Sequence, residues 1–254
     1  MFPIRDQYPS LRPPIVTKAL IVINVLVWLF MQGAGYGIAY FQSLCDWALI
    51  PAHLLGQAPP GTEIPMAPNL VCVLDEDRAT WLTLLTHMFM HGSWFHLISN
   101  MWFLWVFGDN VEDALGHVRF LLFYLASGLA AALAQILAGP GAIAPMVGAS
   151  GAISGVMGAY AWLYPAVLIE VVVPLGLLPV SAFIPAFYML FYWFAIQVIS
   201  GLLAPKDMGG VAWWAHAGGF IAGWFLVRLF YRPDYLAEHM LQPPTFGRLG
   251  APRD

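Results

Sequence analysis

Four polar residues occur in otherwise apolar segments, and their types could perform nucleophilic catalysis. Ser150 opens one segment within Gly-Ala-Ser-Gly at 148–151, and His216 lies in another, within Trp-Trp-Ala-His-Ala-Gly-Gly. His96 and Asn100 are four residues apart in a third segment, so on a helix they share one face. A serine hydroxyl that hydrogen-bonds to a histidine is the usual activated nucleophile of hydrolases. The chemistry suggested is therefore attack by Ser150 with His216 as general base.

Each residue also has a structural explanation when it is taken alone. A serine in an apolar helix usually hydrogen-bonds to its own backbone. A single histidine in a membrane helix needs a specific hydrogen-bond partner, which a structural contact can supply. His96 and Asn100 are residue types that hold helices together by hydrogen bonds. The catalytic interpretation therefore depends on whether the four residues come together in space, which is decided by the elements that carry them.

Composition indicates whether the chain is a soluble protein or a membrane protein. The chain has 254 residues, of which 60% are hydrophobic and 9% charged, against about 25% charged in soluble domains. This low charge argues strongly against a soluble enzyme. The net charge of −4 and the lack of a basic patch argue against a nucleic-acid partner. We predict a single polytopic membrane domain over 1–254, with its core at about 15–231 and cytoplasmic tails at 1–14 and 232–254.

Six apolar segments are candidate membrane-spanning helices, which need about 20 residues each. They lie at about 15–32, 94–107, 120–138, 149–164, 183–203 and 211–231. The second and fourth are short, so we expect less apolar flanks to extend them or their starts to lie below the surface. The fold class predicted is an all-α membrane protein, a six-transmembrane-helix bundle with a long external first loop. The first segment has a signal peptide as its alternative, but the charge pattern requires an even number of spans.

Basic residues orient the bundle. Eight of the ten Lys and Arg residues lie on one side: in the tails, in an even-numbered connection, or near the tail ends of the first and last spans (Lys18 and Arg228). Only Arg78 and Lys206 fall in odd-numbered connections. The positive-inside tendency then places both termini in the cytoplasm. The first connection, roughly 33–93, lies outside, and it holds Cys45 and Cys72 either as a disulfide or as two free buried thiols. Within it we expect a short amphipathic surface helix over 46–55, whereas 167–180 is predicted to be a surface connection or an extension of the fifth helix.

In this topology spans two, four and six all begin on the outer side. Each of the four polar residues lies within about six residues of its span's start, which is roughly 10 Å of depth at about 1.5 Å per residue. His96, Asn100, Ser150 and His216 should therefore occupy one layer in the outer half of the membrane. Glycine pairs four residues apart on two of these spans allow close helix approach: Gly151 with Gly155, and Gly219 with Gly223. A shared layer favours catalysis over four unrelated structural roles.

Other polar residues receive structural interpretations. His87 and His91 suggest zinc, but the segment lacks the glutamate of HExxH and the cysteines lack CxxC spacing. We predict no metal and no cofactor, and we expect these histidines to pack the loop onto the bundle. The acidic and amide residues just after span two should cap and anchor it: Asp109, Asn110, Glu112 and Asp113. Asp207 is too far from His216 in the sequence to join the polar layer. The last residues, 243–254, are expected to be disordered.

From about Leu85 to Trp224 the chain resembles the rhomboid family of intramembrane serine proteases. The resemblance is carried in order by the segment 87–100, by FGDNVEDALG at 107–116, by GASG at 148–151 and by AHAGGFIAG at 215–223. It implies that Ser150 is the nucleophile and His216 the base of a dyad without a carboxylate. It also implies that His96, Asn100 and the backbone N–H of Ser150, with Gly148 beside them, stabilise the oxyanion. The fold it implies is a six-helix bundle with a water-filled cavity that opens outward.

Two positions depart from the family pattern. Many members carry an aromatic residue four positions after the nucleophile, stacked on the base, and here that residue is Ser154. We therefore expect His216 to be oriented by another group, such as Trp213, Trp214 or an aromatic of span five. The Trp-Arg pair often found in the first loop is replaced by Trp-Leu-Thr at 81–83.

The resemblance implies an endopeptidase that cuts membrane-protein substrates in or next to their transmembrane segments, in a bacterial inner membrane. Substrates should reach the site laterally, past a gate on span five formed by Phe187, Phe191, Trp193 and Phe194, under a lid at 204–210. One alternative is an inactive rhomboid-like protein that holds membrane helices. A small transporter or channel is the other, but it would need intramembrane charges, and Glu170 lies in a connection. The oligomeric state is not predicted.

Overall fold

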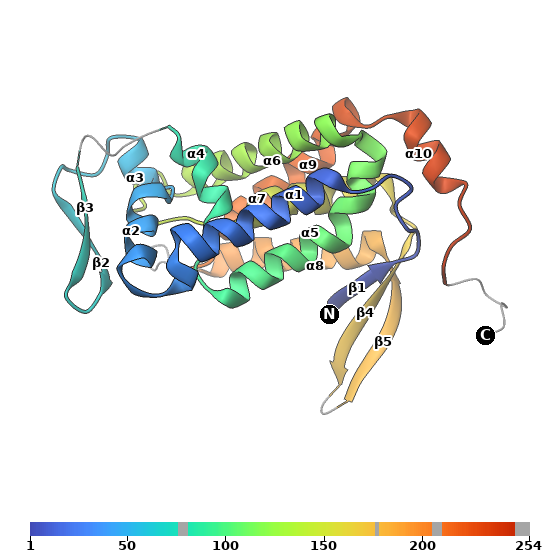
Figure 1. Cartoon of the computed structure of the whole chain (residues 1–254), viewed down its shortest axis with the longest axis horizontal. Coiled ribbons are helices and arrows are strands. Elements are labelled where there is room, and N and C mark those ends of the chain that lie inside the picture. The colour runs from blue at the N-terminus through green and yellow to red at the C-terminus, as the bar shows by residue number, and fades with distance from the viewer. Residues whose placement is uncertain (76–80, 176–177, 205–209, 247–254) are drawn as a thin grey trace.

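The protein is described by a computed structural model that covers residues 1–75, 81–175, 178–204 and 210–246. Its body is a bundle of long helices with α7 in the middle (Figure 1). The bundle helices are α1 (Ile15–Leu26, continued by a π-helical turn at Val27–Met31), α5 (Trp94–Leu115), α6 (His117–Ala138), α7 (Ser150–Leu163), α8 (Ala186–Leu203) and α9 (Trp213–Phe230). They correspond in order to the six predicted segments.

Helix α7 is the core of the bundle because its small residues admit neighbours on all sides. All residues from Gly151 to Ala161 are buried. The helix packs against α5, α6, α8 and α9, and a Cβ atom on Gly158 would overlap the carbonyl oxygen of Phe220. A helix that is apolar on all sides and covered on all sides is a core helix, and its polar first residue, Ser150, is half-buried.

Two helices among the described residues, α6 and α8, are long and apolar enough by themselves to cross a membrane. The apolar helix Ile15–Met31 is shorter. Helix α5 extends eight residues beyond its predicted end at Phe107. Its last two turns are buried although they carry Asn110, Glu112 and Asp113, because the N-terminal segment and α10 cover them.

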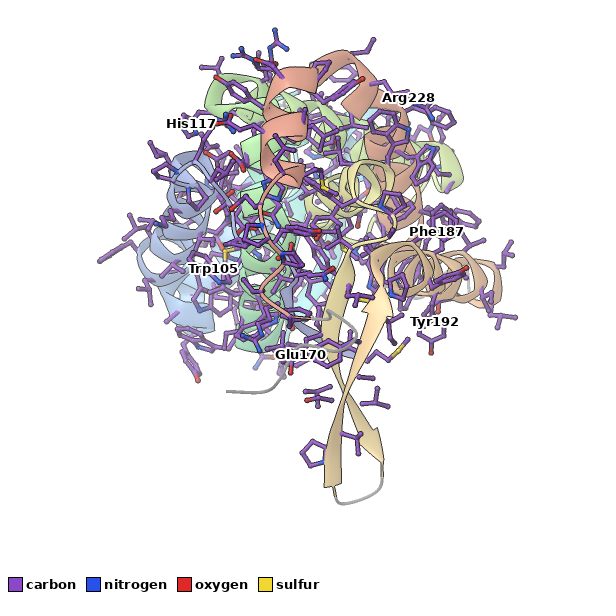
Figure 2. All side chains as sticks on the ribbon, turned by 90° about the vertical axis from the view of Figure 1, so that its right-hand side faces the viewer. Trp105, His117, Glu170, Phe187, Tyr192 and Arg228 are labelled. Carbon is purple, nitrogen blue, oxygen red and sulfur yellow. A yellow bond between two sulfur atoms is a disulfide. The ribbon has the colours of Figure 1, made fainter. Side chains whose placement is uncertain are left out.

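The all-α prediction is wrong in two places, where the chain forms small antiparallel sheets. Strands β4 (Leu168–Leu175) and β5 (Leu178–Pro185) form a hairpin, and β1 (Phe2–Asp6) pairs with β4. We predicted residues 167–180 to be a surface connection or an extension of the fifth helix. They form most of the hairpin because Val171–Val173 is a run of β-branched residues, which have high strand propensity. Prolines 174 and 179 also oppose a helix. The hairpin projects from the bundle, with Glu170 near its base (Figure 2), and α8 starts at Ala186 rather than Phe183.

The predicted tails are ordered elements instead of free ends. Asp113 of α5 accepts hydrogen bonds from the backbone N–H groups of Leu11 and Arg12 and pairs with the Arg12 guanidinium. On its other side it contacts His239 of α10 (Pro233–Met240) at 2.6 Å. The expected disorder of 243–254 is wrong for the described part, since the Thr245 N–H donates to Gln7. Residues 247–254 lie outside the described residues.

Glu112, the neighbour of Asp113, likewise anchors the N-terminal part of the chain to the end of α5, as predicted for the acidic residues there. Its carboxylate accepts from the backbone N–H groups of Val16 and Thr17 at 2.9 and 2.8 Å. A carboxylate at these positions satisfies free N–H groups in the first turn of α1 and opposes the positive end of its dipole. The end of α5 therefore fixes where α1 begins.

The first connection forms a compact cap at the opposite end of the bundle (Figure 1). It contains α2 (Gly37–Trp47), α3 (Pro51–Leu54), α4 (Thr83–Thr86), a 3-10 turn at His87–Phe89 and the second sheet, β2 (Thr62–Ala67) with β3 (Leu70–Leu74). Cys45 and Cys72 form a disulfide that ties α2 to β3. The predicted surface helix over 46–55 is wrong, because Leu49 is fully buried and pairs as an extended residue with Met146.

Candidate active site

Ser150 and His216 come together at the end of the bundle that carries the first connection. Ser150 is the first residue of α7, and His216 lies in the first turn of α9. The Oγ atom of Ser150 lies 2.8 Å from the Nε2 atom of His216. This distance and pairing are those of a serine hydroxyl in contact with a histidine that can accept its proton.

Glycines set the separation of the two helices. A Cβ atom on Gly219 would overlap the carbonyl oxygen of Gly151, and one on Gly223 would overlap that of Gly155. The backbones of α7 and α9 therefore touch directly at two successive turns. The structure thus brings together all four glycines singled out in the sequence, beside the serine and the histidine.

His96 lies beside the serine and is held from two sides. Ser93 caps α5 by accepting the His96 N–H at 3.1 Å. The Nδ1 atom of His96 accepts the Gly92 N–H at 3.3 Å, so in the neutral ring the proton is on Nε2. That nitrogen faces Gly148, where a Cβ atom would come within 2.7 Å of it and within 3.3 Å of Ser150 Oγ.

Gly148 leaves room between the two side chains. Its φ of +129° is unfavourable for residues that carry a Cβ atom. Its N–H donates to the carbonyl oxygen of His87 at 2.9 Å, which fixes the turn that leads into Ser150. A glycine is therefore required here both for backbone conformation and for space.

Asn100 lies one turn further along α5 on the face of His96. The residue is 7% exposed, and its Nδ2 group has no hydrogen-bond partner among the described residues. An unpaired buried amide donor is costly, and such costs are often kept at functional sites. The described contacts include none that joins Asn100 directly to Ser150.

Sequence reasoning missed one member of the site, Gln197 of α8. Its Oε1 atom lies 2.8 Å from the Nδ1 atom of His216. The signal was present, because a glutamine within an apolar span is itself an expensive polar group. Two aromatic rings flank the histidine as well: Trp193 at 5.9 Å and Trp213 at 6.3 Å between ring centroids. The Ser154 hydroxyl donates to the Ser150 carbonyl oxygen at 2.6 Å and makes no hydrogen bond to His216 among the described residues.

The other predicted residues are placed as follows. His87 Nδ1 bonds to the Thr83 carbonyl oxygen at 2.8 Å, and the buried backbone of His91 is held by both amide atoms of Gln32. Both residues fix the loop to the bundle. Within the described part of the chain no group of three potential ligands is arranged for a metal ion. Asp207 and most of the predicted lid, 205–209, lie outside the described residues.

The aromatic residues predicted to form a gate on α8 pack mainly against α9. Phe191 lies 5.3 Å from Trp224, and Phe194 stacks on Phe220 at 4.9 Å. The opposite side of α8 is exposed, including Tyr188 and Tyr192. These aromatics therefore hold α8 on α9, and any outward movement of α8 must break their contacts.

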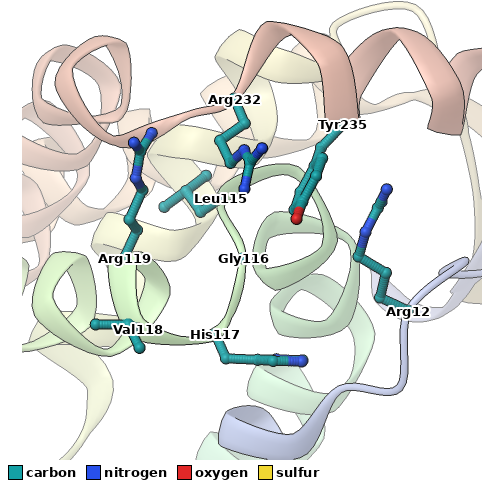
Figure 3. Close-up of a pocket in the computed structure, with 8 residues that line it drawn as sticks. All are labelled: Arg12, Leu115, Gly116, His117, Val118, Arg119, Arg232 and Tyr235. Carbon is teal, nitrogen blue, oxygen red and sulfur yellow. The ribbon is translucent and has the colours of Figure 1, made fainter.

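A pocket at the far end of the bundle is unrelated to this site (Figure 3). It lies where α5 meets α6 and is lined by Arg12, Leu115, Gly116, His117, Val118, Arg119, Arg232 and Tyr235. Arg12 is paired with Asp113 and Glu238, and Arg232 is paired with Asp234. Because carboxylates already neutralise two of its arginines, we assign no ligand to this pocket.

A bundle of apolar helices holds a half-buried serine–histidine pair at one end, which is the arrangement of a membrane-embedded serine hydrolase. The family profile described as the Rhomboid domain matches residues 78–233. The chain belongs to the rhomboid family. Rhomboid proteins are multi-pass membrane proteins, and the helical bundle fits this class.

Individual relatives show the same kinship. RHOMBOID-like protein 1 of Arabidopsis thaliana is 29% identical over 239 residues, which cover 92% of this chain and 56% of that protein. Rhomboid protease GluP of Bacillus subtilis is 42% identical over 82 residues, 32% of this chain and 16% of that protein. Rhomboid protein 1 of Saccharomyces cerevisiae, a mitochondrial protein, is 34% identical over 98 residues, 37% of this chain and 28% of that protein. The chain spans about half the length of RHOMBOID-like protein 1 and of RHOMBOID-like protein 5 of Arabidopsis thaliana.

Proposed function

We propose that this protein is an intramembrane serine endopeptidase that hydrolyses peptide bonds in or next to the transmembrane segments of other membrane proteins. The observation that carries the proposal is the 2.8 Å contact between Ser150 Oγ and His216 Nε2. Membership of a family that includes a named protease, GluP, supports it. No metal or cofactor has a role in the proposed reaction.

In the proposed reaction His216 removes the proton from Ser150 as the hydroxyl attacks the peptide carbonyl, and it then protonates the amine that leaves when the C–N bond breaks. Water, deprotonated by His216, next attacks the acyl-Ser150 ester, which releases the carboxylic acid product and returns the proton to Ser150. Ser150 begins α7, so free N–H groups and the positive end of the helix dipole lie where negative charge develops. The His96 Nε2–H faces Gly148, next to Ser150, and the Nδ2 group of Asn100 has no hydrogen-bond partner among the described residues. The backbone N–H of Ser150, the His96 Nε2–H and the Asn100 amide form the proposed oxyanion hole.

We further propose six membrane spans in one polytopic domain, with both termini in the cytoplasm. The sheet of β1, β4 and β5 and helix α10 gather at one end of the bundle, and the cap of the first connection lies at the other (Figure 1). The disulfide in that cap suits an oxidising compartment outside the cell. The site would then lie in the outer half of the bilayer. The bacterial inner membrane remains the proposed location, although some relatives are mitochondrial proteins.

The proposed substrates are transmembrane helices that unwind readily. A regular helix hides its carbonyl groups in its own hydrogen bonds, so the scissile segment must open before Ser150 can attack. Small or helix-breaking residues near the outer membrane face lower the cost of opening. An inactive rhomboid-like protein that only binds helices is the rival function, and the intact Ser150–His216 pair argues against it.

Cleavage of a reconstituted substrate tests the proposal. The purified full chain is placed in liposomes with a membrane protein whose transmembrane helix carries Gly and Ala near its outer end, and products are identified by mass spectrometry. We expect cleavage by the wild type and none by Ser150→Ala. The matched control is Ser99→Ala, because among the described residues the Ser99 hydroxyl bonds only to the Phe95 carbonyl oxygen of its own helix, α5. Equal cleavage by wild type and Ser150→Ala would overturn the proposal.

A further inference from the structure

Gln197 makes a buried side-chain contact to the far side of the histidine ring. The residue is 5% exposed and lies on α8, whereas the serine and histidine lie on α7 and α9. Its Oε1 atom is 2.8 Å from His216 Nδ1, and Ser150 Oγ is 2.8 Å from Nε2 of the same ring. The three side chains therefore form one chain of hydrogen bonds from three helices.

The orientation of the amide follows from a second hydrogen bond. The Gln197 Nε2 group donates to the carbonyl oxygen of Trp193, one helical turn earlier, at 3.3 Å. A carbonyl oxygen accepts only from a donor, so the amide nitrogen faces Trp193 and the amide oxygen faces His216. This second bond removes the usual ambiguity between the two ends of a glutamine side chain.

The amide oxygen in turn determines the form of the histidine. Oxygen cannot donate, so Nδ1 of the neutral ring must carry the proton and donate it to Gln197. The lone pair is then on Nε2 and faces the Ser150 hydroxyl, as a general base requires. The other tautomer would place an N–H against Ser150 and leave Nδ1 against the amide oxygen with two acceptors in contact.

We propose that Gln197 is the positioning residue of the active site, which holds His216 in the Nδ1–H tautomer and in the ring orientation needed to take the Ser150 proton. This inference rests on the proposed function. Gln197 would occupy the place that a carboxylate occupies in serine–histidine–aspartate triads. The flanking rings of Trp193 and Trp213 restrict where the imidazole lies, but the ring contacts do not select a tautomer.

A consequence concerns α8. Because Gln197 is on this helix, the tautomer is fixed only while α8 stays packed on α9 through contacts such as Phe194 on Phe220. Movement of α8 to admit a substrate would release the histidine, and its return would restore the base. Positioning of the base would thus be coupled to closure of the site.

The test compares three variants of the whole 254-residue chain with the wild type in detergent. Gln197→Met keeps the length of the side chain and removes the acceptor, whereas Gln197→Glu keeps an acceptor at the same place. The matched control is Gln135→Met, because Gln135 Oε1 also bonds to α9, by accepting the Ala215 N–H at 3.2 Å, and makes no hydrogen bond to His216 among the described residues. For Gln197→Met we expect kcat to fall by roughly 10²-fold, as for a misaligned catalytic group, with KM unchanged. Gln197→Glu should recover most of kcat, and Gln135→Met should retain it.

A readout independent of turnover is the tautomer itself. The ¹⁵N spectrum of ring-labelled histidine, assigned with His216→Ala and recorded in the Ser150→Ala background, should show the Nδ1–H form with Gln197 and a mixture of forms with Met. An unchanged tautomer and wild-type kcat in Gln197→Met would overturn the inference and leave the proposed protease intact. A Gln197-dependent tautomer in a wild-type protein that cleaves nothing would instead contradict the proposed function and support the positioning contact.

Discussion

The Oγ atom of Ser150 lies 2.8 Å from His216 Nε2 although 66 residues separate the two in the sequence. The contact is possible because α7 and α9 meet backbone to backbone at glycines. A serine at the start of one helix and a histidine in the first turn of the other then lie at the same height. The packing of small residues thus sets the geometry of the proposed chemistry.

We predict that Gly219→Ala separates the pair. The added Cβ atom would overlap the Gly151 carbonyl oxygen, so α9 must shift, at a cost of roughly 1–3 kcal/mol for overpacking. Turnover should fall more steeply than the thermal midpoint in detergent. Gly141→Ala is the control, because a Cβ atom there would meet nothing closer than 3.9 Å. Normal turnover in Gly219→Ala would show that this contact does not set the site.

Asn100→Ala should impair cleavage without unfolding the protein. The Nδ2 group has no partner among the described residues, so its removal breaks no described hydrogen bond in the resting structure. Loss of one oxyanion donor typically lowers kcat by about 10²–10³-fold. Turnover and thermal unfolding are measured side by side. Unchanged turnover would remove Asn100 from the oxyanion hole.

Crosslinking α8 to α5 through an introduced pair of cysteines should block cleavage of membrane substrates but not reaction with a small serine-directed probe. If substrates reach the site between these helices, the crosslinked protein will not cleave a membrane-embedded substrate. It should still react with a small serine-directed probe, because Ser150, His216 and Gln197 keep their contacts. Reduction of the crosslink should restore cleavage. Undiminished cleavage by the crosslinked form would exclude this route.

Asp6, which accepts hydrogen bonds from Tyr160 and Asn110 at the other end of the bundle, makes the stability of the fold depend on pH. Burial raises the pKa of Asp6 from 3.8 to about 6, although Tyr160 and Asn110 donate hydrogen bonds to it. The folded state therefore holds its proton more tightly than the unfolded chain. This contribution to stability is complete below about pH 4 and is lost as the pH rises through about 6, by at most about 3 kcal/mol.

Thermal unfolding of the wild type and Asp6→Asn between pH 4 and 7 tests this sign. The amide is neutral at every pH and still offers an oxygen to Tyr160. The wild-type midpoint should therefore fall relative to the variant as the pH rises. A difference that stays constant across the range would show that Asp6 does not titrate in this interval.

The sequence was informative where one physical requirement dominates. Apolar length located the six helices, and the cost of polar groups in lipid singled out Ser150, His216, His96 and Asn100. It was uninformative where tertiary contacts decide. The valine run of β4 favours a strand, but its apolar length does not show that it pairs with β1 and β5. Asp113 indicated a helix end, but its bonds to Arg12 and His239 depend on segments more than 100 residues away.

Gln197 illustrates the same limit within the site. A glutamine in an apolar span is energetically unfavourable, so its residue type marked it as a candidate. Its distance from His216 along the sequence, however, does not indicate a contact, which forms only because α8 packs beside α9. Family resemblance directed attention to an aromatic partner for the base, and Trp193 and Trp213 do lie beside the ring. The polar partner on Nδ1 became visible only from the side-chain geometry.

The most direct test of the central claim is labelling of the purified, folded protein by a fluorophosphonate probe, which reacts with activated serines. We predict that the wild type is labelled at Ser150 and that both Ser150→Ala and His216→Ala lose the label, while Ser99→Ala keeps it. Absence of labelling in folded wild type, repeated with a small permeant inhibitor that does not need an open site, would contradict an activated serine and favour a protein that only binds membrane helices.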